Sequence, residues 1–392
     1  MTRYDVCASV VSDLQYDARV WKEARSLARA GYRVALLGCR YDLPAVTRRV
    51  EDGIDVVEIP LGGRTGPRNP VQRAGVLLRL WWEILRTQAR IYHSHNVHPA
   101  PAAWLASRVR RSLLVYDGHE LFGESADKGL VARGTSSITR LVEAWMVRHS
   151  EMVIATNPSR AAELKRRHGN REIVVLANVP LRVDTVQPLD PGFPSGVKVL
   201  LYQGGIYLER AFEETIRALT DLEDFHLVIL GFGRETEIAQ IRSYAEGQGV
   251  GGRVTFLPPR PFAQLVHTAA GAAVGIVPIR PTTLNHYMGD TNKLHEYLMA
   301  GLPVVTSDLP EMRRVVQEGN PHVGEVFDPA VPASIAAAVR RVVADPAVYA
   351  ARRREARRVA LEKFNWQVEE VRLLGAYERL GSPILPTAEE AS

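Results

Sequence analysis

Residues 289–308 read GDTNKLHEYLMAGLPVVTSD, and this stretch predicts a short helix followed at once by a buried strand. Asp290, Thr291 or Asn292 can cap the start of the helix, and Gly301 can end it. A helix that leads into an apolar strand in this way is typical of α/β proteins. In doubly wound sheets ligands bind beyond the carboxyl ends of the strands, so the loops there are the places to search for a site.

The charged residues of this helix point to an anionic ligand. Lys293 lies in the first turn, where the helix dipole disfavours a cation. The cation becomes favourable if an anion such as a diphosphate binds the free amides beside it. Glu296 lies one turn further along the same face, where its carboxylate can accept hydrogen bonds from a ribose. An ordinary Lys–Glu surface pair is the structural alternative.

Apolar strand-like runs alternate with amphipathic helical patterns along the chain, which predicts βαβ units and parallel sheets. A length of 392 residues suits two domains. The alternation loosens in the proline-rich stretch 181–196, which is the best candidate for a linker. We therefore expect two doubly wound α/β domains, over residues 1–183 and 197–364, joined by a linker at 184–196. We expect residues 365–392 to form a final helix and tail.

The composition is that of a globular protein, with 46% apolar residues, 24% charged residues and a net charge of +5. No apolar run reaches the roughly 18 residues of a membrane-spanning helix, and the first residues do not form a signal-peptide pattern. Cys7 and Cys39 lie in apolar strand-like runs, which indicates buried thiols in a reducing compartment. We expect a cytoplasmic protein without a nucleic-acid-binding module.

Two further loops follow predicted strands and carry glycines. In YQGGIYLER, Gly204 and Gly205 come directly after a strand and Arg210 precedes a helix. Glycine lets a backbone approach a phosphate and arginine supplies charge, although an ordinary tight turn has the same sequence pattern. Gly231, in LVILGFGRE, follows another strand, and lines a nucleotide pocket or serves a structural turn. The third glycine of a dinucleotide fingerprint is missing there, so no nicotinamide cofactor is assigned.

Six segments of the chain, taken in order, resemble the family-four glycosyltransferases with the GT-B fold. Each segment is weak by itself, but their order along the chain is specific. The segments are SDLQYDARVWKEARSLARAGYRV (12–34), VYDGHE (115–120), VLANVP (175–180), YQGGIYLERAFEETIRAL (202–219), NKLHEYLMAGLPVVTSDLPEMRRVV (292–316) and FNWQVEEVRLLGAYERL (364–380).

The resemblance implies two Rossmann-like domains that face each other across a cleft, with a sugar nucleotide bound by the C-terminal domain and an acceptor by the N-terminal domain. It implies that the last helix, Asn365 to Leu380, crosses back onto the N-terminal domain. It also implies transfer with retention of the anomeric configuration, by attack on the face from which the diphosphate leaves. The departing phosphate can then take the proton of the acceptor.

By the same resemblance, Arg210 and Lys293 hold the diphosphate, and Glu296 matches the second glutamate of the family's Glu-x7-Glu motif, which binds the donor ribose. His119 matches a histidine that the family places beside the transferred sugar. We therefore expect His119, Arg210 and Lys293 to take part in catalysis. The residues expected to line the donor site are Gly204, Gly205, Gly231, Arg210, Asp290, Thr291, Asn292, Lys293, Leu294 and Glu296.

The chain departs from the family pattern at two places. The first glutamate of the motif falls at Met288, which leaves the identity of the donor sugar open, with Asp290 as the nearest acidic residue. The N-terminal turn reads SDLQYD and lacks the paired glycines that many members carry. Fold and reaction class do not depend on either feature.

A metal ion is not expected. His93, His95 and His98 cluster in YHSHNVH, but no cysteine or carboxylate within that segment completes a ligand set, and lining of a cleft is the better interpretation, with His95 near the acceptor. The chain has no Asp-x-Asp pair, with which single-domain glycosyltransferases hold a divalent ion. Arg210, Lys293 and a helix N-terminus can neutralise the diphosphate instead, so we expect no cofactor besides the donor substrate.

The helix expected over Val71–Arg90 combines a broad apolar face, four arginines and the pair Trp81–Trp82. Packing on the N-terminal sheet is the simpler interpretation, and contact with a membrane surface is the alternative. In the second case the acceptor is lipid-linked. A sugar and a natural product are the other acceptors considered, and the loop Gly62–Pro70 is one place where that choice is encoded.

The sequence thus predicts a retaining, metal-independent glycosyltransferase that uses a nucleoside diphosphate sugar. A carboxylate at Glu296 favours a ribonucleotide donor, UDP- or GDP-linked, because a deoxyribose offers one hydroxyl fewer. The alternatives are a non-hydrolysing sugar-nucleotide 2-epimerase of the same fold and a non-catalytic nucleotide-sugar binding protein. The sequence does not indicate the donor sugar, the base, the acceptor, the pathway or the oligomeric state.

Overall fold

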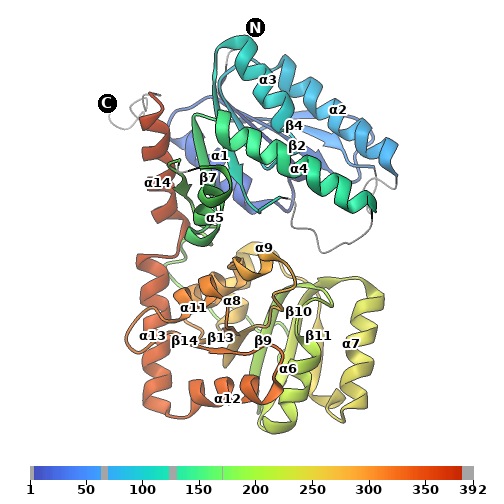
Figure 1. Cartoon of the computed structure of the whole chain (residues 1–392). Helices are drawn as coiled ribbons and strands as arrows, with labels where there is room; N and C mark the ends of the chain where they lie inside the picture. The colour runs from blue at the N-terminus through green and yellow to red at the C-terminus, as the bar shows by residue number, and fades with distance from the viewer. Residues whose placement is uncertain (1–3, 63–68, 123–129, 170, 382–392) are drawn as a thin grey trace. The chain divides into compact units, whose positions relative to one another are not determined.

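The computed structural model describes residues 4–62, 69–122, 130–169 and 171–381, with the backbone alone over 130–136. The chain forms two compact units (Figure 1). Unit 1 comprises the chain up to Ala177 and again from Glu369 onward, and unit 2 comprises Asn178–Val368. The chain therefore enters unit 2 once and returns to unit 1 in its last helix.

Unit 1 is built on an eight-stranded sheet of order β3-β4-β2-β1-β5-β6-β7-β8, in which all pairs are parallel except β3 with β4. Its strands are β1 (Tyr4–Asp13), β2 (Val34–Arg40), β3 (Thr47–Glu51), β4 (Ile54–Pro60), β5 (Ala89–His95), β6 (Leu113–Gly118), β7 (Met152–Ala155) and β8 (Val174–Val175). Its helices are α1 (Ala18–Arg29), α2 (Pro70–Arg86), α3 (Ala100–Arg110), α4 (Leu130–His149), α5 (Pro158–His168) and most of α14 (Trp366–Arg379).

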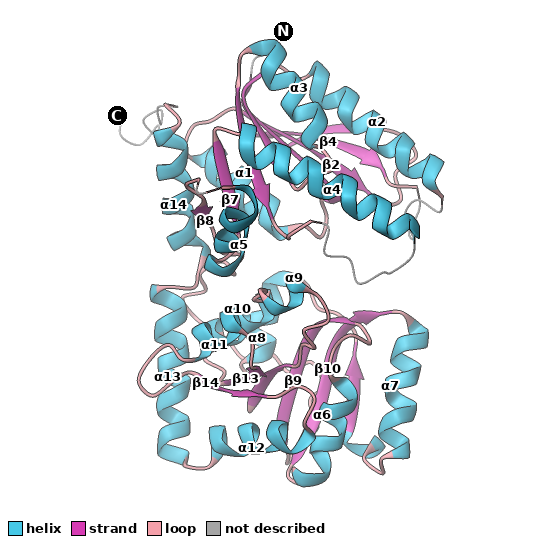
Figure 2. Cartoon of the chain, in the orientation of Figure 1, coloured by secondary structure: helices cyan, strands magenta, loops and turns pink. Residues whose placement is uncertain are grey.

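Unit 2 is built on a six-stranded, all-parallel sheet of order β11-β10-β9-β12-β13-β14. Its strands are β9 (Lys198–Ile206), β10 (Phe225–Gly233), β11 (Val254–Leu257), β12 (Val274–Val277), β13 (Val304–Ser307) and β14 (Gly324–Phe327). Its helices are α6 (Phe212–Ala218), α7 (Glu235–Gly247), α8 (Phe262–Ala269), α9 (Leu284–Tyr287), α10 (Asn292–Met299), α11 (Pro310–Val316), α12 (Pro332–Val343) and α13 (Pro346–Glu362), with short 3₁₀ turns at Leu219–Asp221 and Gly251–Arg253 (Figure 2).

Both sheets have a point at which the strand order reverses, and such a point is where open α/β sheets bind ligands. In unit 1 the first strand, β1, lies between β2 and β5. In unit 2 the first strand, β9, lies between β10 and β12. The carboxyl ends of β5 and β9 therefore border these two points, and β6 lies beside β5. Each of the three strands is followed by residues that the sequence analysis singles out.

The structure confirms the predicted α/β class and parallel sheets and adds detail that the sequence pattern lacks. The apolar run EIVVLANVP (172–180) has the sequence pattern of a strand, but it contributes only the two residues of β8. The stretch expected as a linker, 184–196, lies within unit 2. It has no regular secondary structure, and the amide of Leu189 donates to the carbonyl of His267 in α8.

Other expectations meet mixed outcomes. Cys7 and Cys39 are buried free thiols, as expected. Of the loop Gly62–Pro70, residues 63–68 lie outside the described residues, as does the tail from 382 onward. Among the described helices, none is both long enough and apolar enough to cross a bilayer.

Candidate active site

In unit 2, helix α10 begins beside the carboxyl end of β9. Thr291 is the N-cap residue, but its side chain makes no capping hydrogen bond. Gly204, at the end of β9, has a φ of 121°, a conformation that favours glycine. A Cβ atom at Gly204 would lie 3.2 Å from Cε of Lys293. The lysine side chain therefore runs along the glycine backbone.

Lys293 and Arg210 form a concentration of positive charge in this place. Lys293 is buried, with Nζ 5.1 Å from the ring centroid of Tyr202. Burial, and then the neighbouring Arg210 cation, lower the pKa of Lys293 to about 7, while Glu296 opposes the shift. Within the described part of the chain, Nε and Nη1 of Arg210 are buried without a hydrogen-bond partner. Two close, incompletely neutralised cations are costly unless an anion joins them, so the geometry fits an anion site.

Glu296 is oriented by a residue that the sequence analysis did not select. Nε2 of the buried Gln203 donates to the Glu296 carboxylate at 2.5 Å. The amide of Gln203 donates to the hydroxyl of Tyr297, 2.8 Å away, and that hydroxyl donates to the carbonyl of Leu201. The strand end and the helix are thus fixed to each other, and the carboxylate is fixed with them. A glutamine directly before a Gly-Gly pair at a strand end was the available signal.

The remaining predicted donor-site residues fall into two groups. Gly231 is explained by close packing, because a Cβ atom there would lie 1.8 Å from the carbonyl oxygen of Gly204. A Cβ atom at Gly205 would lie 2.5 Å from the ring of the exposed Tyr207, a side chain that can move away. The side chain of Leu294 is fully buried, so only its backbone can face a ligand.

The residues just before α10 serve local structure. The carboxylate of Asp290 contacts Nε2 of His295 at 2.9 Å, and Asp290 is therefore held against α10, the helix that follows it. Asn292 is the first residue of α10. Met288 follows the short helix α9, where its amide donates to the carbonyl of Leu284. The position that carries the first motif glutamate in the family is thus a helix end here.

In unit 1, His119 follows β6 and its backbone is held from two sides. Its amide donates to Oδ1 of Asn96 at 2.9 Å, and its carbonyl accepts from Nη1 of Arg160 at 2.7 Å. The ring Nε2 lies 3.2 Å from Oδ2 of Asp117 and 3.1 Å from Nδ1 of His95. Because the side chain of His119 is still 17% exposed, the ring is both positioned and accessible.

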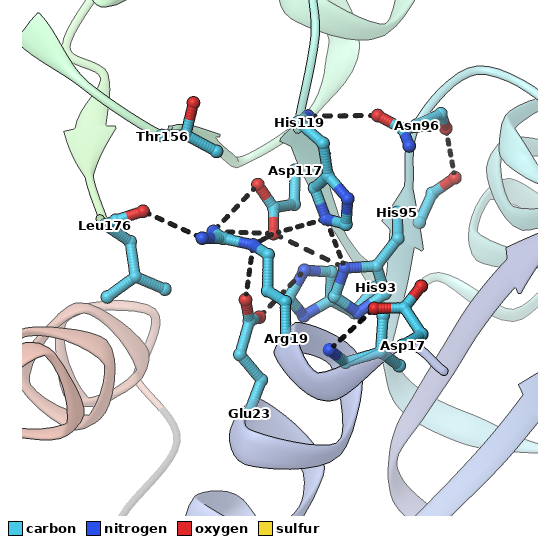
Figure 3. Close-up of polar contacts among 12 residues, drawn as sticks. Asp17, Arg19, Glu23, His93, His95, Asn96, Asp117, His119, Thr156 and Leu176 are labelled. Carbon is cyan, nitrogen blue, oxygen red and sulfur yellow. Dashed lines mark hydrogen bonds and ion pairs between the residues drawn. The ribbon is translucent and has the colours of Figure 1, made fainter. Parts of the chain in front are cut away.

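Beneath His119 lies a buried ionic cluster that the sequence analysis missed (Figure 3). Arg19 of α1 contacts both carboxylate oxygens of Asp117 at 3.0–3.2 Å and donates to the carbonyl of Leu176. Its Nε also lies 3.0 Å from Glu23. His93 and His95 stack with ring centroids 4.2 Å apart, and Nδ1 of His93 lies 2.7 Å from the hydroxyl of Tyr377 in α14.

The two carboxylates of this cluster differ in charge. Burial raises the pKa of a carboxyl group, but the Arg19 guanidinium and His119 hold the pKa of Asp117 well below its usual range. Burial raises the pKa of Glu23 well above its usual range, and the negative charge of Asp117 adds to this although Arg19 opposes it. Asp117 is therefore the ionised partner of Arg19, and Glu23 is the neutral acid.

The structure corrects the sequence argument about metal ligands. Glu23 and Asp117 complete a group with His93 and His95 whose ligand atoms lie within 4.8 Å of one another, although neither carboxylate is in the histidine segment. Arg19 already supplies the positive charge between these carboxylates, and a dication beside a buried guanidinium would be repelled. We therefore interpret the group as an arginine-centred cluster. His95 is fully buried under His119, so it is not on the surface that an acceptor would contact.

Glu23→Gln tests the neutral state of Glu23. The folded protein retains a proton on Glu23 that the unfolded chain loses above pH 4.5, so this group lowers stability as the pH rises from that value to the folded-state pKa. Relative to the wild type, the free energy of unfolding of Glu23→Gln should therefore rise with pH in that window, by up to about 1.4 kcal/mol per pH unit. Chemical denaturation at several pH values measures this difference in stability.

Asp117→Asn is the comparison variant. It should lower the stability of the fold, because it leaves Arg19 buried without its counter-ion. A Glu23→Gln variant that loses stability at neutral pH would show an ionised Glu23.

Comparison with known proteins places both units in one family. The model described as glycosyl transferase 4-like domain matches residues 16–179, and the model described as glycosyl transferases group 1 matches residues 197–345. A glycogen synthase of Mycobacterium tuberculosis is 30% identical over 279 residues, which are 67% of this chain and 64% of that protein. A D-inositol 3-phosphate glycosyltransferase of Corynebacterium diphtheriae is 26% identical over 285 residues, 65% of this chain and 66% of that protein. The chain thus matches just under two thirds of the length of these relatives.

Solved structures show the same fold. A sucrose-phosphate synthase from Thermosynechococcus elongatus superposes with a TM-score of 0.80 at 18% identity, over 97% of this chain and 99% of that one. Anabaena HepE, solved in complex with UDP and glucose, gives a TM-score of 0.69 at 13% identity, over 96% and 100% of the two chains. One family model matches in each unit, and the fold is that of the solved enzymes. The chain therefore belongs to the group 1 glycosyl transferases of the GT-B fold.

Proposed function

We propose that this protein is a retaining, metal-independent glycosyltransferase that moves a sugar from a nucleoside diphosphate sugar to a hydroxyl or amine acceptor. The observation that carries the proposal is the pair of cations Lys293 and Arg210 at the switch point of unit 2, beside an oriented Glu296. The diphosphate of the donor is negatively charged and neutralises these two cations. The ribose supplies hydroxyl donors for the carboxylate.

The chemistry asked of unit 2 is stabilisation of a leaving group. As the bond between the anomeric carbon and the diphosphate breaks, negative charge grows on the leaving phosphate oxygen. Lys293 and Arg210 are already in position, so no reorganisation is needed when that charge develops. This placement of two cations supports transfer without a metal ion. Retention follows from attack on the face that the diphosphate leaves, with the leaving phosphate accepting the acceptor's proton.

We assign His119 of unit 1 to contact with the reacting sugar. Its backbone is held by Asn96 and Arg160, and its ring rests on the ionised Asp117. A histidine beside a fixed carboxylate can hold a hydroxyl of the sugar and stabilise positive charge on it. It need not act as the base, because the departing phosphate does so.

The donor is proposed to be a ribonucleotide, UDP- or GDP-linked. Glu296 fixed by Gln203 is a charged acceptor suited to ribose hydroxyls. Solved relatives of the same fold support the class of donor: Anabaena HepE was solved with UDP and glucose and with UDP-glucose.

Replacement of Glu296 by alanine is the direct test of the ribose contact. The wild type should bind its preferred nucleoside diphosphate roughly 10- to 100-fold more tightly than the 2′-deoxy form, since a hydrogen bond to a charged group is lost. Glu296→Ala should bind the two forms almost equally, with weaker binding of the ribonucleotide. Isothermal titration calorimetry in EDTA measures both affinities.

Glu235→Ala is the matched control, because Glu235 is an exposed glutamate in the first turn of α7 in the same unit. It should leave the discrimination unchanged. If Glu296→Ala keeps the wild-type preference for the ribonucleotide, the ribose is bound elsewhere.

A further inference from the structure

Three consecutive helices of unit 1, α2, α3 and α4, lie side by side, with α3 in contact with both neighbours (Figure 1). Trp104 of α3 meets Trp145 of α4 edge to face, with ring centroids 5.4 Å apart. The indole of Trp81 in α2 donates to the carbonyl of His98, just before α3. We call the outer surface of residues 70–86, 100–110 and 137–149 the three-helix face.

Large apolar side chains are exposed along this face at helical spacing. Within each helix they recur three, four or seven residues apart, so they form one stripe per helix. A helix packed on a sheet by its inner side would normally carry polar residues there. The exposed apolar residues, 43–80% accessible, are Val71, Leu78 and Trp82 on α2, Leu105 and Val109 on α3, and Ile138, Leu141 and Trp145 on α4.

The charge that accompanies these stripes is positive. The sequences of the three helices contain only two carboxylates, Glu83 and Glu143, and both side chains are buried. Glu83 is paired with Arg48 and Arg86. The exposed charged side chains described on the face are all arginines: Arg73, Arg79, Arg86, Arg108, Arg140 and Arg148.

A surface hollow of about 350 Å³ lies between α3 and α4 on this face. Its lining is apolar and includes Trp104, Leu105, Leu141 and Trp145. A second hollow adjoins it at the two tryptophans and is lined by three arginines, Arg108, Arg148 and Arg171, and by one carboxylate, Glu151, which pairs with Arg108. An apolar hollow next to a basic one matches a molecule with an acyl chain and an anionic head group.

We propose that the three-helix face docks this protein on the surface of an anionic lipid bilayer. Leucine, isoleucine and valine stripes enter the acyl boundary, tryptophan suits the interface, and arginines contact acidic head groups. A second copy of the chain is disfavoured, because a two-fold contact would set arginine against arginine. A nucleic acid would use the arginines but leave the apolar stripes exposed to water.

The experiment is co-sedimentation of the full chain with vesicles of phosphatidylcholine and with vesicles that also contain phosphatidylglycerol. The wild type should sediment with the second and stay in solution with the first. Raising the salt concentration should weaken binding, because head-group attraction is screened.

Two matched pairs of variants locate the contact. Val109→Asp should weaken binding by on the order of tenfold, since it carries a charge into the apolar boundary. Val371→Asp should not, although Val371 on α14 is exposed to the same extent, 72%. Arg148→Glu should weaken binding by at least about fivefold. Arg354→Glu on α13 should not, although Arg354 is also exposed.

Three results would overturn the proposal. The first is the absence of binding to phosphatidylglycerol vesicles, and the second is an equal loss in Val371→Asp. The third is a dimer in light scattering that Val109→Asp dissociates, which would assign the face to a second copy. Thermal unfolding of each variant shows that a loss of binding does not come from a loss of fold.

Discussion

Lys293→Met is expected to lower the affinity for nucleoside diphosphates about 100-fold, because it removes a buried charge-assisted contact with phosphate. The same substitution should stabilise the ligand-free protein by about 1–4 kcal/mol, since burying the lysine beside Arg210 without an anion is costly. Binding and stability thus change in opposite directions. A purely structural lysine would give loss of both.

The pH dependence of protein stability provides a second test of the charge on Lys293. In the ligand-free protein Lys293 has a pKa of about 7, against 10.5 in the unfolded chain. Below pH 7 the folded state carries the full cost of the buried charge, and that cost disappears as the pH rises from 7 to 10.5. Relative to Lys293→Met, the ligand-free wild type should therefore gain stability over this range.

Ligand binding at pH 8 should then be accompanied by proton uptake, because the diphosphate favours the charged lysine. Calorimetry in buffers of different ionisation enthalpy measures the number of protons taken up. The wild type should take up a fraction of a proton and Lys293→Met almost none. Lys198→Met is the control, since Lys198 is a half-exposed lysine of the same unit paired with Asp224, and it should behave as the wild type. Equal affinities of Lys293→Met and the wild type would remove this lysine from the site.

His119→Ala is expected to reduce turnover by about 100- to 10,000-fold while leaving nucleotide affinity unchanged. The reason is that the residues expected to bind the nucleotide, the two cations and Glu296, are in unit 2, whereas His119 is in unit 1. The local backbone should persist, because Asn96 and Arg160 hold main-chain atoms of residue 119. The measurement is the release of nucleoside diphosphate from sugar nucleotide, with water as the acceptor.

His149→Ala is the matched control for that experiment, because His149 is the last residue of α4 in the same unit and is not assigned to the site. It should retain most of the turnover. A His119→Ala variant with near-normal turnover would exclude the histidine from the reaction, and one with much weaker nucleotide binding would point to a wider disturbance of the protein.

The parts of the site that the sequence predicts are those encoded within one segment. Lys293 and Glu296 lie in one helix, and the Gly-Gly pair at the end of β9 comes only a few residues before Arg210, so each group can be recognised within one segment. The fold class follows in the same way from alternating strands and helices. The resemblance to a family adds the order of these segments along the chain.

The buried cluster of unit 1 could not be found in this way. Arg19 and Asp117 are 98 positions apart, and neither has a local pattern that marks it as buried. Only the parallel pairing of β1, β5 and β6 brings the start of α1 to the two strand ends. The same long-range pairing supplies the carboxylates near His93 and His95. Gln203 was missed for a different reason: its role depends on Glu296, which lies 93 positions further along the chain.

Secondary structure shows the same limits. The apolar run EIVVLANVP reads as a strand, but pairing with β7 extends over two residues only. The helix α13 is rich in arginine and was not assigned, because its buried side is narrow and includes Arg352, which bonds carbonyls at the edge of β14.

The central claim is that unit 2 binds the diphosphate and ribose of a nucleotide donor by its own charges. Calorimetric titration of the wild type with UDP, GDP and dTDP, first in EDTA and then with magnesium, tests it most directly. The account predicts binding of UDP or GDP in the micromolar range in EDTA, little change with magnesium, and weaker binding of dTDP. Binding that requires magnesium, or binding of none of the three, would contradict it.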